Sequence, residues 1–129
     1  MKILVVEDDY SIRETLGMVL QAYQHHVDLL DNGETVVPHL KTSWPDVMLL
    51  DLTLQGMTGE EVYCCIQAEF GRVPPTIVLS AARPGESRAK LLPGTRFLGK
   101  PCDLDELQEM IEQVGGGVSQ DIEKSKPRC

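Results

Sequence analysis

Three carboxylates stand where two short apolar runs end. Residues 3–6 (ILVV) are followed by Glu7 and Asp8, and residues 47–50 (VMLL) are followed by Asp51. Runs of this kind are typical of strands buried in a parallel sheet, whose carboxyl ends meet at one edge, where open α/β folds bind their ligands. Like charges this close repel each other, and a divalent cation is the usual remedy. The chain is therefore expected to gather an acidic cluster at one sheet edge.

Two further apolar runs end in polar side chains of other kinds. Residues 76–79 (TIVL) are followed by Ser80, and residues 97–99 (FLG) are followed by Lys100. Alone, each polar residue has an ordinary explanation, as an acid at a helix N-terminus, a loop carboxylate, a turn serine or a solvated lysine. The joint pattern favours one shared site over these separate explanations.

Composition limits the class of protein. The 129-residue chain is long enough for one domain with its own core. A formal charge of -8 and a pI near 4.8 argue against direct binding of nucleic acid or an anionic membrane. No apolar stretch reaches membrane-spanning length, and the immediate first strand leaves no room for a signal peptide, so we expect a soluble cytoplasmic protein.

The cysteines and histidines show no metal-binding spacing. The four cysteines form neither a C-x-x-C pair nor a zinc motif: Cys64, Cys65, Cys102 and Cys129. We expect them to be reduced thiols. The histidines, His25, His26 and His39, lack i, i+4 pairing, and we interpret them as separate surface residues.

Strand-like and helix-like segments alternate five times, which predicts an α/β fold. The expected architecture is a doubly wound, flavodoxin-like, five-stranded parallel sheet with helices on both faces. Ser11 and Glu14 predict a capping box for the first helix, whose inward face would carry Ile12, Leu16, Val19, Leu20 and Tyr23. Its Met18 is assigned to ordinary packing.

The remaining helices are predicted from turn and capping signals. Pro38 should shorten a helix at 35–41, and residues 86–92 leave room only for a short fourth helix. Thr58 and Glu61 predict a capping box for a helix that ends before Gly71. The last helix starts at Asp103 and stops at the glycines of 115–117, with Leu104, Leu107, Ile111 and Val114 facing inward. The domain would thus span 1–115, followed by a flexible tail or linker at 116–129.

Such a site suits phosphoryl transfer to a carboxylate. Mg²⁺ prefers oxygen ligands and uses one or two carboxylates plus phosphate oxygens, which matches Asp8 and Asp51, with Glu7 acting through water. In-line attack by Asp51 needs positioning and charge stabilisation more than acid–base chemistry. Ser80 and Lys100 can supply both at the phosphoryl oxygens.

At this point the sequence resembles the receiver domain of two-component response regulators, the chemotaxis-type fold. The resemblance covers residues 2–114 and rests on four motifs: ILVVEDD at 3–9, DVMLLDL at 46–52, SA at 80–81 and KP at 100–101. It implies that Asp51 is the phosphoacceptor and that Lys100 contacts the phosphoryl group. Glu7 and Asp8 would be the acid pair, and the Thr53 backbone carbonyl would complete a shell for Mg²⁺, with Mn²⁺ as a possible substitute.

The resemblance also implies a conformational switch. Ser80 would be the switch hydroxyl, and Phe97 the aromatic side chain that turns inward on phosphorylation. The alternative for Phe97 is a permanently buried core residue, because phenylalanine lacks the hydroxyl that favours an outward position. A cis bond between Lys100 and Pro101 is implied as well.

The resemblance implies signalling partners. A sensor histidine kinase, in trans or in a longer chain, would donate the phosphoryl group in a phosphorelay, and a downstream effector would read the change. The domain would be a phosphoprotein that catalyses its own phosphorylation and dephosphorylation, not a turnover enzyme, with no direct contact to nucleic acid or membrane.

Three departures from the family pattern affect loops and output. Gln55 stands where the family usually has proline after the acceptor, so that loop should turn with more freedom. The last helix presents acids where DNA-binding receiver dimers usually present basic residues: Asp105, Glu106, Glu109 and Glu112. The stretch from Ser80 to Lys100 is shorter than in most receivers, and its segment 91–98 resembles receivers attached to sensor histidine kinases more than those of transcription factors.

Two alternatives remain open from the sequence. One is a phosphatase or phosphotransferase with an aspartyl nucleophile, although the segment after Asp51 lacks a second acid two residues on. The other is a degenerate receiver that serves as a phosphorylation-independent docking module.

Overall fold

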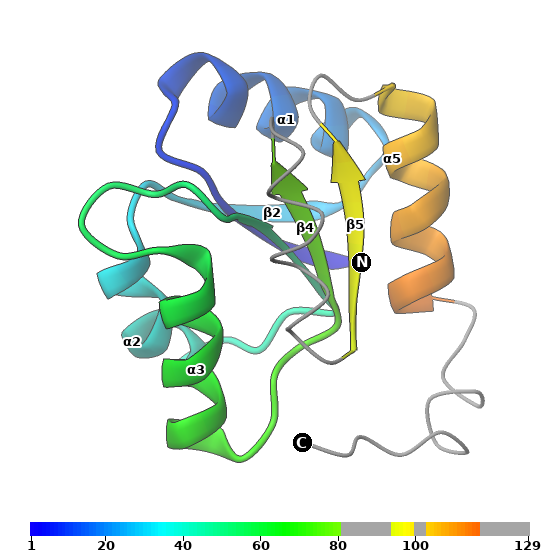
Figure 1. Ribbon diagram of the computed structural model, residues 1–129. Helices are drawn as coiled ribbons and strands as arrows, with labels where there is room; N and C mark the ends of the chain where they lie inside the picture. The colour runs from blue at the N-terminus through cyan, green and yellow to red at the C-terminus, as the bar shows by residue number, and fades with distance from the viewer. Residues whose placement is uncertain (81–93, 100–102, 117–129) are drawn as a thin grey trace.

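The computed structural model describes residues 1–80, 94–99 and 103–116, and these residues form one layered α/β unit. Its five strands are β1 (Lys2–Val6), β2 (His26–Leu30), β3 (Val47–Asp51), β4 (Thr76–Ser80) and β5 (Thr95–Gly99). They pair in parallel in the order β2-β1-β3-β4-β5. This is the expected doubly wound parallel sheet, seen edge-on in Figure 1.

Helices cover both faces of the sheet. The helix α1 (Tyr10–Ala22) and the helix α5 (Leu104–Ile111), which continues as a π-turn over Glu112–Gly116, lie on one face (Figure 1). A 3-10 turn at Gly33–Thr35, the helix α2 (Val36–Leu40) and the helix α3 (Gly59–Phe70) lie on the other. The short helix predicted near Pro38 is therefore present, and the expected helix at 86–92 lies outside the described residues.

The two helical layers bury alternate residues of the same strands. Ile3 and Val5 of β1 pack with α1 and α5, whereas Leu4 and Val6 pack with α2 and α3. The same alternation holds in β3, all five residues of which are buried. Because successive strand side chains point to opposite faces, an apolar run without alternation is the pattern that a sheet covered on both faces requires.

Capping was predicted correctly for α3 and wrongly for α1. The Thr58 hydroxyl accepts the Glu61 amide at 3.2 Å while the Glu61 carboxylate accepts the Thr58 amide at 2.8 Å, which is the expected box. Gly71 ends α3 with φ of 74°. In α1 the cap is Asp9, whose carboxylate accepts the Ile12 amide at 2.9 Å. The helix begins two residues earlier than predicted, so Ser11 lies inside its first turn.

The C-terminal end of α1 also differs from the prediction. Tyr23, expected on the buried face, is 42 % exposed because the helix ends at Ala22 and Tyr23 leaves the helical face. Its hydroxyl donates to the Asp105 carboxylate at 3.0 Å, and this hydrogen bond raises the pKa of the Tyr23 phenol above its ordinary value. Met18, assigned to packing, is 71 % exposed. By contrast, Leu107, Ile111 and Val114 of the last helical segment are buried as predicted.

The three histidines were expected to be separate surface residues; His26 is exposed as predicted, but His25 and His39 are half-buried and all three have close neighbours. His25 is half-buried, with its Nε2 at 3.0 Å from the Gln108 side-chain oxygen and its Nδ1 at 3.2 Å from the Met1 ammonium. His26 and His39 both approach Asp28. Sequence spacing did not show the contacts of His25 and His39 because their partners lie on other elements, whereas His26 and Asp28 are two residues apart on β2. Cys64 and Cys65 are free thiols on α3, as predicted, and Cys102 and Cys129 lie outside the described residues.

Three other predictions fall on undescribed parts of the chain. Lys100 and its bond to Pro101 lie outside the described residues, as does the expected tail at 116–129 apart from Gly116. Within the described ranges, no helix has the length and apolar character needed to cross a bilayer.

Gly59 provides a test of the packing that holds the loop after β3. A Cβ there would lie 2.7 Å from the Leu52 Cα and 2.9 Å from the Asp51 carbonyl oxygen, both backbone atoms. We predict that Gly59→Ala lowers the free energy of unfolding by about 1–3 kcal/mol in urea denaturation. Gly17→Ala in α1 is the matched control, because its closest contact is the movable end of Leu29 and alanine favours the helix. An equal decrease in the free energy of unfolding in both variants would contradict the conclusion that Gly59 packs against the backbone of Asp51 and Leu52.

Candidate functional site

The strand pairing places the three carboxylates together. β1 and β3 are adjacent and parallel, with Val6 opposite Leu50, so Glu7 and Asp8 leave β1 where Asp51 ends β3. One ligand oxygen from each of the three carboxylates lies within 4.8 Å of the others. The acidic cluster expected from the sequence is therefore present at the carboxyl edge of the sheet.

Two of these carboxylates are buried. Glu7 is 1 % exposed and Asp51 is 4 % exposed, whereas Asp8 is half-buried. Burying a charge without compensation is costly, so such groups need hydrogen bonds, opposite charges or a metal ion around them. The local backbone supplies part of that compensation.

Each carboxylate accepts a backbone amide from the loop beside it. The Asp9 amide donates to Glu7 at 3.2 Å, and the Thr53 amide donates to Asp51 at 3.0 Å. The Gln55 amide donates to Asp8 at 3.2 Å. These bonds fix the orientation of the carboxylates before any ligand arrives. Since an ionised carboxylate has about four lone-pair positions, one amide bond to each is compatible with a shared cation.

The loop after β3 is held at both ends. Leu52 and Leu54 are buried, and the Gly59 amide donates to the Leu52 carbonyl at 3.0 Å. Between them the chain turns through Gly56, whose φ is 81°. The bond from Gln55 to Asp8 depends on a departure from the family pattern, because proline at this position would have no amide to donate. Gln55 was expected to give this loop more conformational freedom than proline would, but its amide adds a hydrogen bond to the acidic cluster.

Arg13 is a neighbour of the site that the sequence analysis missed. Its Nη1 donates to the Glu7 carbonyl oxygen at 2.9 Å, and its guanidinium lies 5.5 Å from the centre of the Tyr10 ring. The signal was available, since α1 begins at the site and Arg13 lies on its first turn. The arginine adds positive charge close to the three carboxylates.

The other expected site residues are only partly described. Ser80 ends β4 beside Gly99 of β5, and its backbone lies one residue beyond Leu79, the partner of Asp51. Its side chain, like all of Lys100, lies outside the described residues. Phe97 is half-buried and packs against the small cluster of Leu52, Tyr63 and Val78. Thr53 follows Asp51 by two residues and contacts it through its amide.

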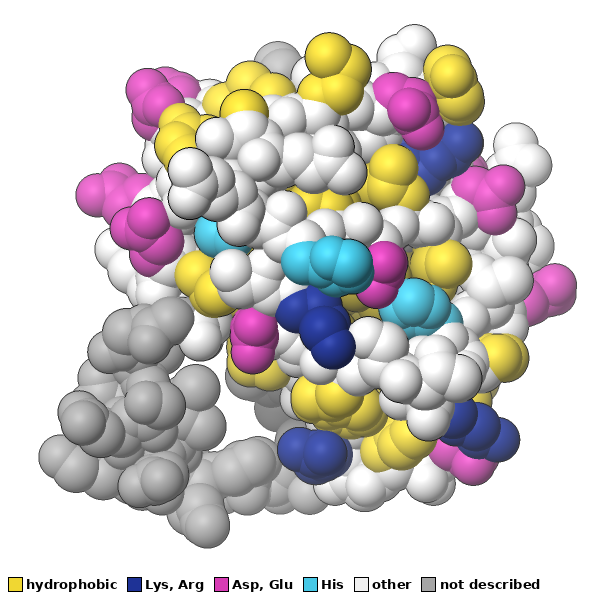
Figure 2. Space-filling model, turned by 180° about the vertical axis from the view of Figure 1, so that it is seen from behind, with side chains coloured by type: hydrophobic (Ala, Val, Ile, Leu, Met, Phe, Trp, Pro, Cys, Tyr) yellow, Lys and Arg dark blue, Asp and Glu magenta, His cyan; other side chains and the backbone are white. Residues whose placement is uncertain are grey.

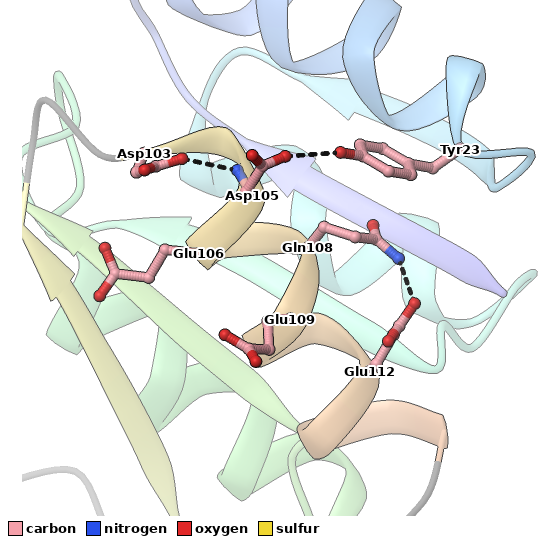
Figure 3. Close-up of a pocket in the computed structure, with 7 residues that line it drawn as sticks. All are labelled: Tyr23, Asp103, Asp105, Glu106, Gln108, Glu109 and Glu112. Atoms are coloured by element: carbon pink, nitrogen blue, oxygen red, sulfur yellow. Dashed lines mark hydrogen bonds between the residues drawn. The ribbon is translucent and has the colours of Figure 1, made fainter.

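A second group of acids lies on a different surface, around α5. They line a hollow together with Tyr23 and Gln108 (Figure 3): Asp103, Asp105, Glu106, Glu109 and Glu112. The sequence had indicated an acidic last helix but not the hollow. Tyr23 donates to Asp105, and the Gln108 amide donates to Glu112 at 2.8 Å. Among the His, Cys, Asp and Glu side chains of the described residues, only Glu7, Asp8 and Asp51 form a group of three whose ligand atoms lie within 4.8 Å of one another.

The family of the chain follows from comparison with known proteins. The model of the response regulator receiver domain matches residues 3–112. The chain therefore belongs to the response regulator receiver domains, the class that its fold and acidic cluster define.

Individual relatives agree with this assignment. The chain is 30 % identical over 117 residues to the transcriptional regulatory protein KdpE of Staphylococcus aureus, covering 88 % of this chain and 49 % of that protein. It is 29 % identical to the transcriptional regulatory protein CrdR of Helicobacter pylori, covering 87 % of this chain and 54 % of that protein. The chain thus spans about half the length of these two curated relatives.

Solved structures show the same fold. The receiver domain of sensor histidine kinase PA1611 from Pseudomonas aeruginosa superposes with a TM-score of 0.81 at 26 % identity, covering 90 % of this chain and 98 % of that one. In that structure a magnesium ion is coordinated in the active-site cleft. The chemotaxis protein CheY4 of Vibrio cholerae superposes with a TM-score of 0.76 at 24 % identity, covering 88 % of this chain and 97 % of that one.

The acidic cluster gives a prediction for metal-linked stability. A cation that binds only the folded protein stabilises it, by about 2.7 kcal/mol at about 100 times its Kd. We predict that Mg²⁺ raises the Tm of the wild-type protein and that Asp8→Asn reduces this increase, as measured by thermal unfolding. Glu69→Gln removes one negative charge from an exposed side chain near the C-terminal end of α3, where it faces Lys41, and is the control. An increase that survives Asp8→Asn unchanged would place the metal elsewhere.

Proposed function

We propose that this receiver domain is a phosphorylation switch in which Asp51 accepts a phosphoryl group from the phosphohistidine of a sensor histidine kinase. The observation that carries the proposal is the convergence of Glu7, Asp8 and Asp51 at the carboxyl edge of β1 and β3. Family membership supports it, because two-component receivers act by accepting phosphate. The relatives' names and the magnesium of the PA1611 receiver support the same chemistry.

The nucleophile in this proposal is the Asp51 carboxylate. One of its oxygens forms a new O–P bond as the P–N bond to the donor imidazole breaks, and the electron pair leaves with the imidazole. The transition state is loose, so the protein acts by positioning and by stabilising charge. The Thr53 amide, which donates to Asp51, fixes the orientation of the carboxylate for in-line attack.

Glu7 and Asp8 are the proposed metal ligands together with Asp51 and the Thr53 carbonyl. Carboxylate oxygens suit Mg²⁺, and Mn²⁺ accepts the same donor set. When bound, the ion neutralises charge on the transferred group. The Gln55 amide holds Asp8 toward this centre from the opposite loop. We assign Lys100 to the phosphoryl oxygens as a second source of positive charge.

The proposed output involves Ser80 and Phe97. Ser80 would hydrogen-bond the phosphoryl group, and Phe97 would then turn further inward. Support comes from the position of Phe97 in β5, half-buried against Tyr63 and Val78. A half-buried ring has apolar surface left to bury, which a permanently enclosed core residue would not have.

The proposal defines the protein as a phosphoacceptor rather than a turnover enzyme. Each chain would accept one phosphoryl group and later lose it to water through its own site. Its partners would be a sensor histidine kinase in the cytoplasm and a downstream effector domain or protein. The formal charge of -8 supports a receiver that does not itself contact nucleic acid.

Phosphorylation by a small donor tests the assignment of Asp51. After incubation with acetyl phosphate and Mg²⁺, we expect intact-mass analysis to show one added phosphoryl group on the wild-type protein. Chelation of the metal and Asp51→Asn should each abolish the addition, because one removes charge neutralisation and the other removes the nucleophile. Glu69→Gln, at an exposed side chain near the C-terminal end of α3, should leave it unchanged.

Three results, from this experiment and from parallel assays with a phosphate ester and a phosphorylated kinase, would contradict the proposal. Addition to the Asp51→Asn variant would assign the acceptor to another residue. Continuous hydrolysis of a phosphate ester would indicate a phosphatase. Absence of any adduct, from acetyl phosphate and from a phosphorylated kinase alike, would favour the docking module.

A further inference from the structure

A second group of metal-ligating side chains lies outside the acidic cluster, on β2 and α2. His26 and Asp28 are two residues apart on β2, so their side chains point to the same face of the sheet. That is the α2 side, because Leu30, two residues further on, packs in the cluster that contains Val36 of α2. His39 reaches Asp28 from α2. Figure 2 shows histidine side chains beside an acidic one near the middle of this surface.

The distances within the group suit a metal ion. The Nε2 of His39 lies 3.2 Å from one carboxylate oxygen of Asp28, and the Nε2 of His26 lies 3.6 Å from the other. Two ligands at about 2.0–2.1 Å from a tetrahedral ion stand about 3.3 Å apart. The His39–Asp28 pair has about this spacing and the His26–Asp28 pair is slightly wider, but the three ligand atoms do not lie within 4.8 Å of one another as those of the acidic cluster do.

One movement is needed to bring all three ligands to a single ion. The two imidazoles contact different oxygens of Asp28, so their nitrogens do not yet converge. His39 and Asp28 are the better fixed ligands, with 22 % and 30 % of their side chains exposed. The His26 side chain is 72 % exposed and can change rotamer with little loss of packing. His39 and Asp28 thus form a pair that is already in place, and the exposed His26 would move to supply the third ligand.

The chemistry of the group selects the class of ion. Two neutral imidazoles and one carboxylate form a mixed nitrogen and oxygen set with one negative charge, typical of zinc and nickel sites. Magnesium prefers oxygen ligands alone, so it should favour the carboxylate cluster at the carboxyl ends of β1 and β3. β2 is an outer strand of the sheet, which leaves solvent access to the group.

We propose that His26, Asp28 and His39 form a binding site for a divalent transition-metal ion, with Zn²⁺ as the reference ion. The site is independent of the phosphorylation chemistry, since none of its ligands belongs to the acidic cluster. It adds a metal-binding activity on the α2 side of the domain. Water molecules would complete the coordination of the ion.

Imidazole NMR tests this site residue by residue. Zn²⁺ is titrated into ¹⁵N-labelled protein at about pH 7.5, where neutral imidazole is the ordinary form, with excess Mg²⁺ present to occupy the carboxylate cluster. The thiols are first alkylated so that they cannot bind zinc. We expect the Nε2 signals of His26 and His39 to shift together, whereas those of His25, which contacts Gln108, stay in place.

Calorimetry with matched variants completes the test. Because changing even an outer-shell partner of a metal typically lowers affinity about 10-fold or more, we expect Asp28→Asn and His39→Gln each to weaken Zn²⁺ binding at least about tenfold. His26→Gln should act in the same direction and, at an exposed side chain, should leave the fold intact. Asp31→Asn is the charge control, and circular dichroism checks the fold of every variant.

Two results would overturn the proposal. The first is unchanged Zn²⁺ affinity in both Asp28→Asn and His39→Gln. The second is a titration in which the His26 and His39 signals do not move, or move no more than those of His25. Either would show that the two imidazoles lie beside Asp28 without sharing a metal ion with it.

Discussion

The repulsion among three carboxylates at one sheet edge is the constraint on which the site depends. The pairing of β1 with β3 brings Glu7, Asp8 and Asp51 within reach of one ion, and two of them are buried. Alone, this arrangement would destabilise the fold. The surrounding structure offsets the repulsion with a backbone amide to each carboxylate and with Arg13 near Glu7. In the proposed function, a cation would complete the compensation and become a condition of the chemistry.

The parts of the fold that could be predicted from the sequence are those set by local or periodic signals. The apolar runs of β1 and β3 are buried on both sides, so their lack of alternation identified a covered parallel sheet. The capping box of Thr58 and Glu61 involves residues three apart and was read correctly. The acidic cluster was predictable for a related reason: parallel strands end at a common edge, so residues that follow them must meet.

Contacts between distant elements could not be predicted in this way. Tyr23 binds Asp105 across α1 and α5, and His39 meets Asp28 across α2 and β2. The spacing of residues along the chain does not predict these pairs, because they depend on how the helices pack against the sheet. The capping of α1 failed for a subtler reason, since Asp9 and Ser11 are both good caps and the packing of the helix selects between them. The tie between Gln55 and Asp8 needed the loop geometry itself.

The most direct test of the account is to locate a bound paramagnetic ion. Mn²⁺ accepts the same oxygen ligands as Mg²⁺ and broadens the NMR signals of nearby amides. At substoichiometric Mn²⁺, we expect the amides of Glu7, Asp8 and residues 51–55 to broaden first. Broadening that begins instead at the acidic surface of α5, around Asp105 and Glu109, would show that the three convergent carboxylates are not the metal centre and would contradict the account.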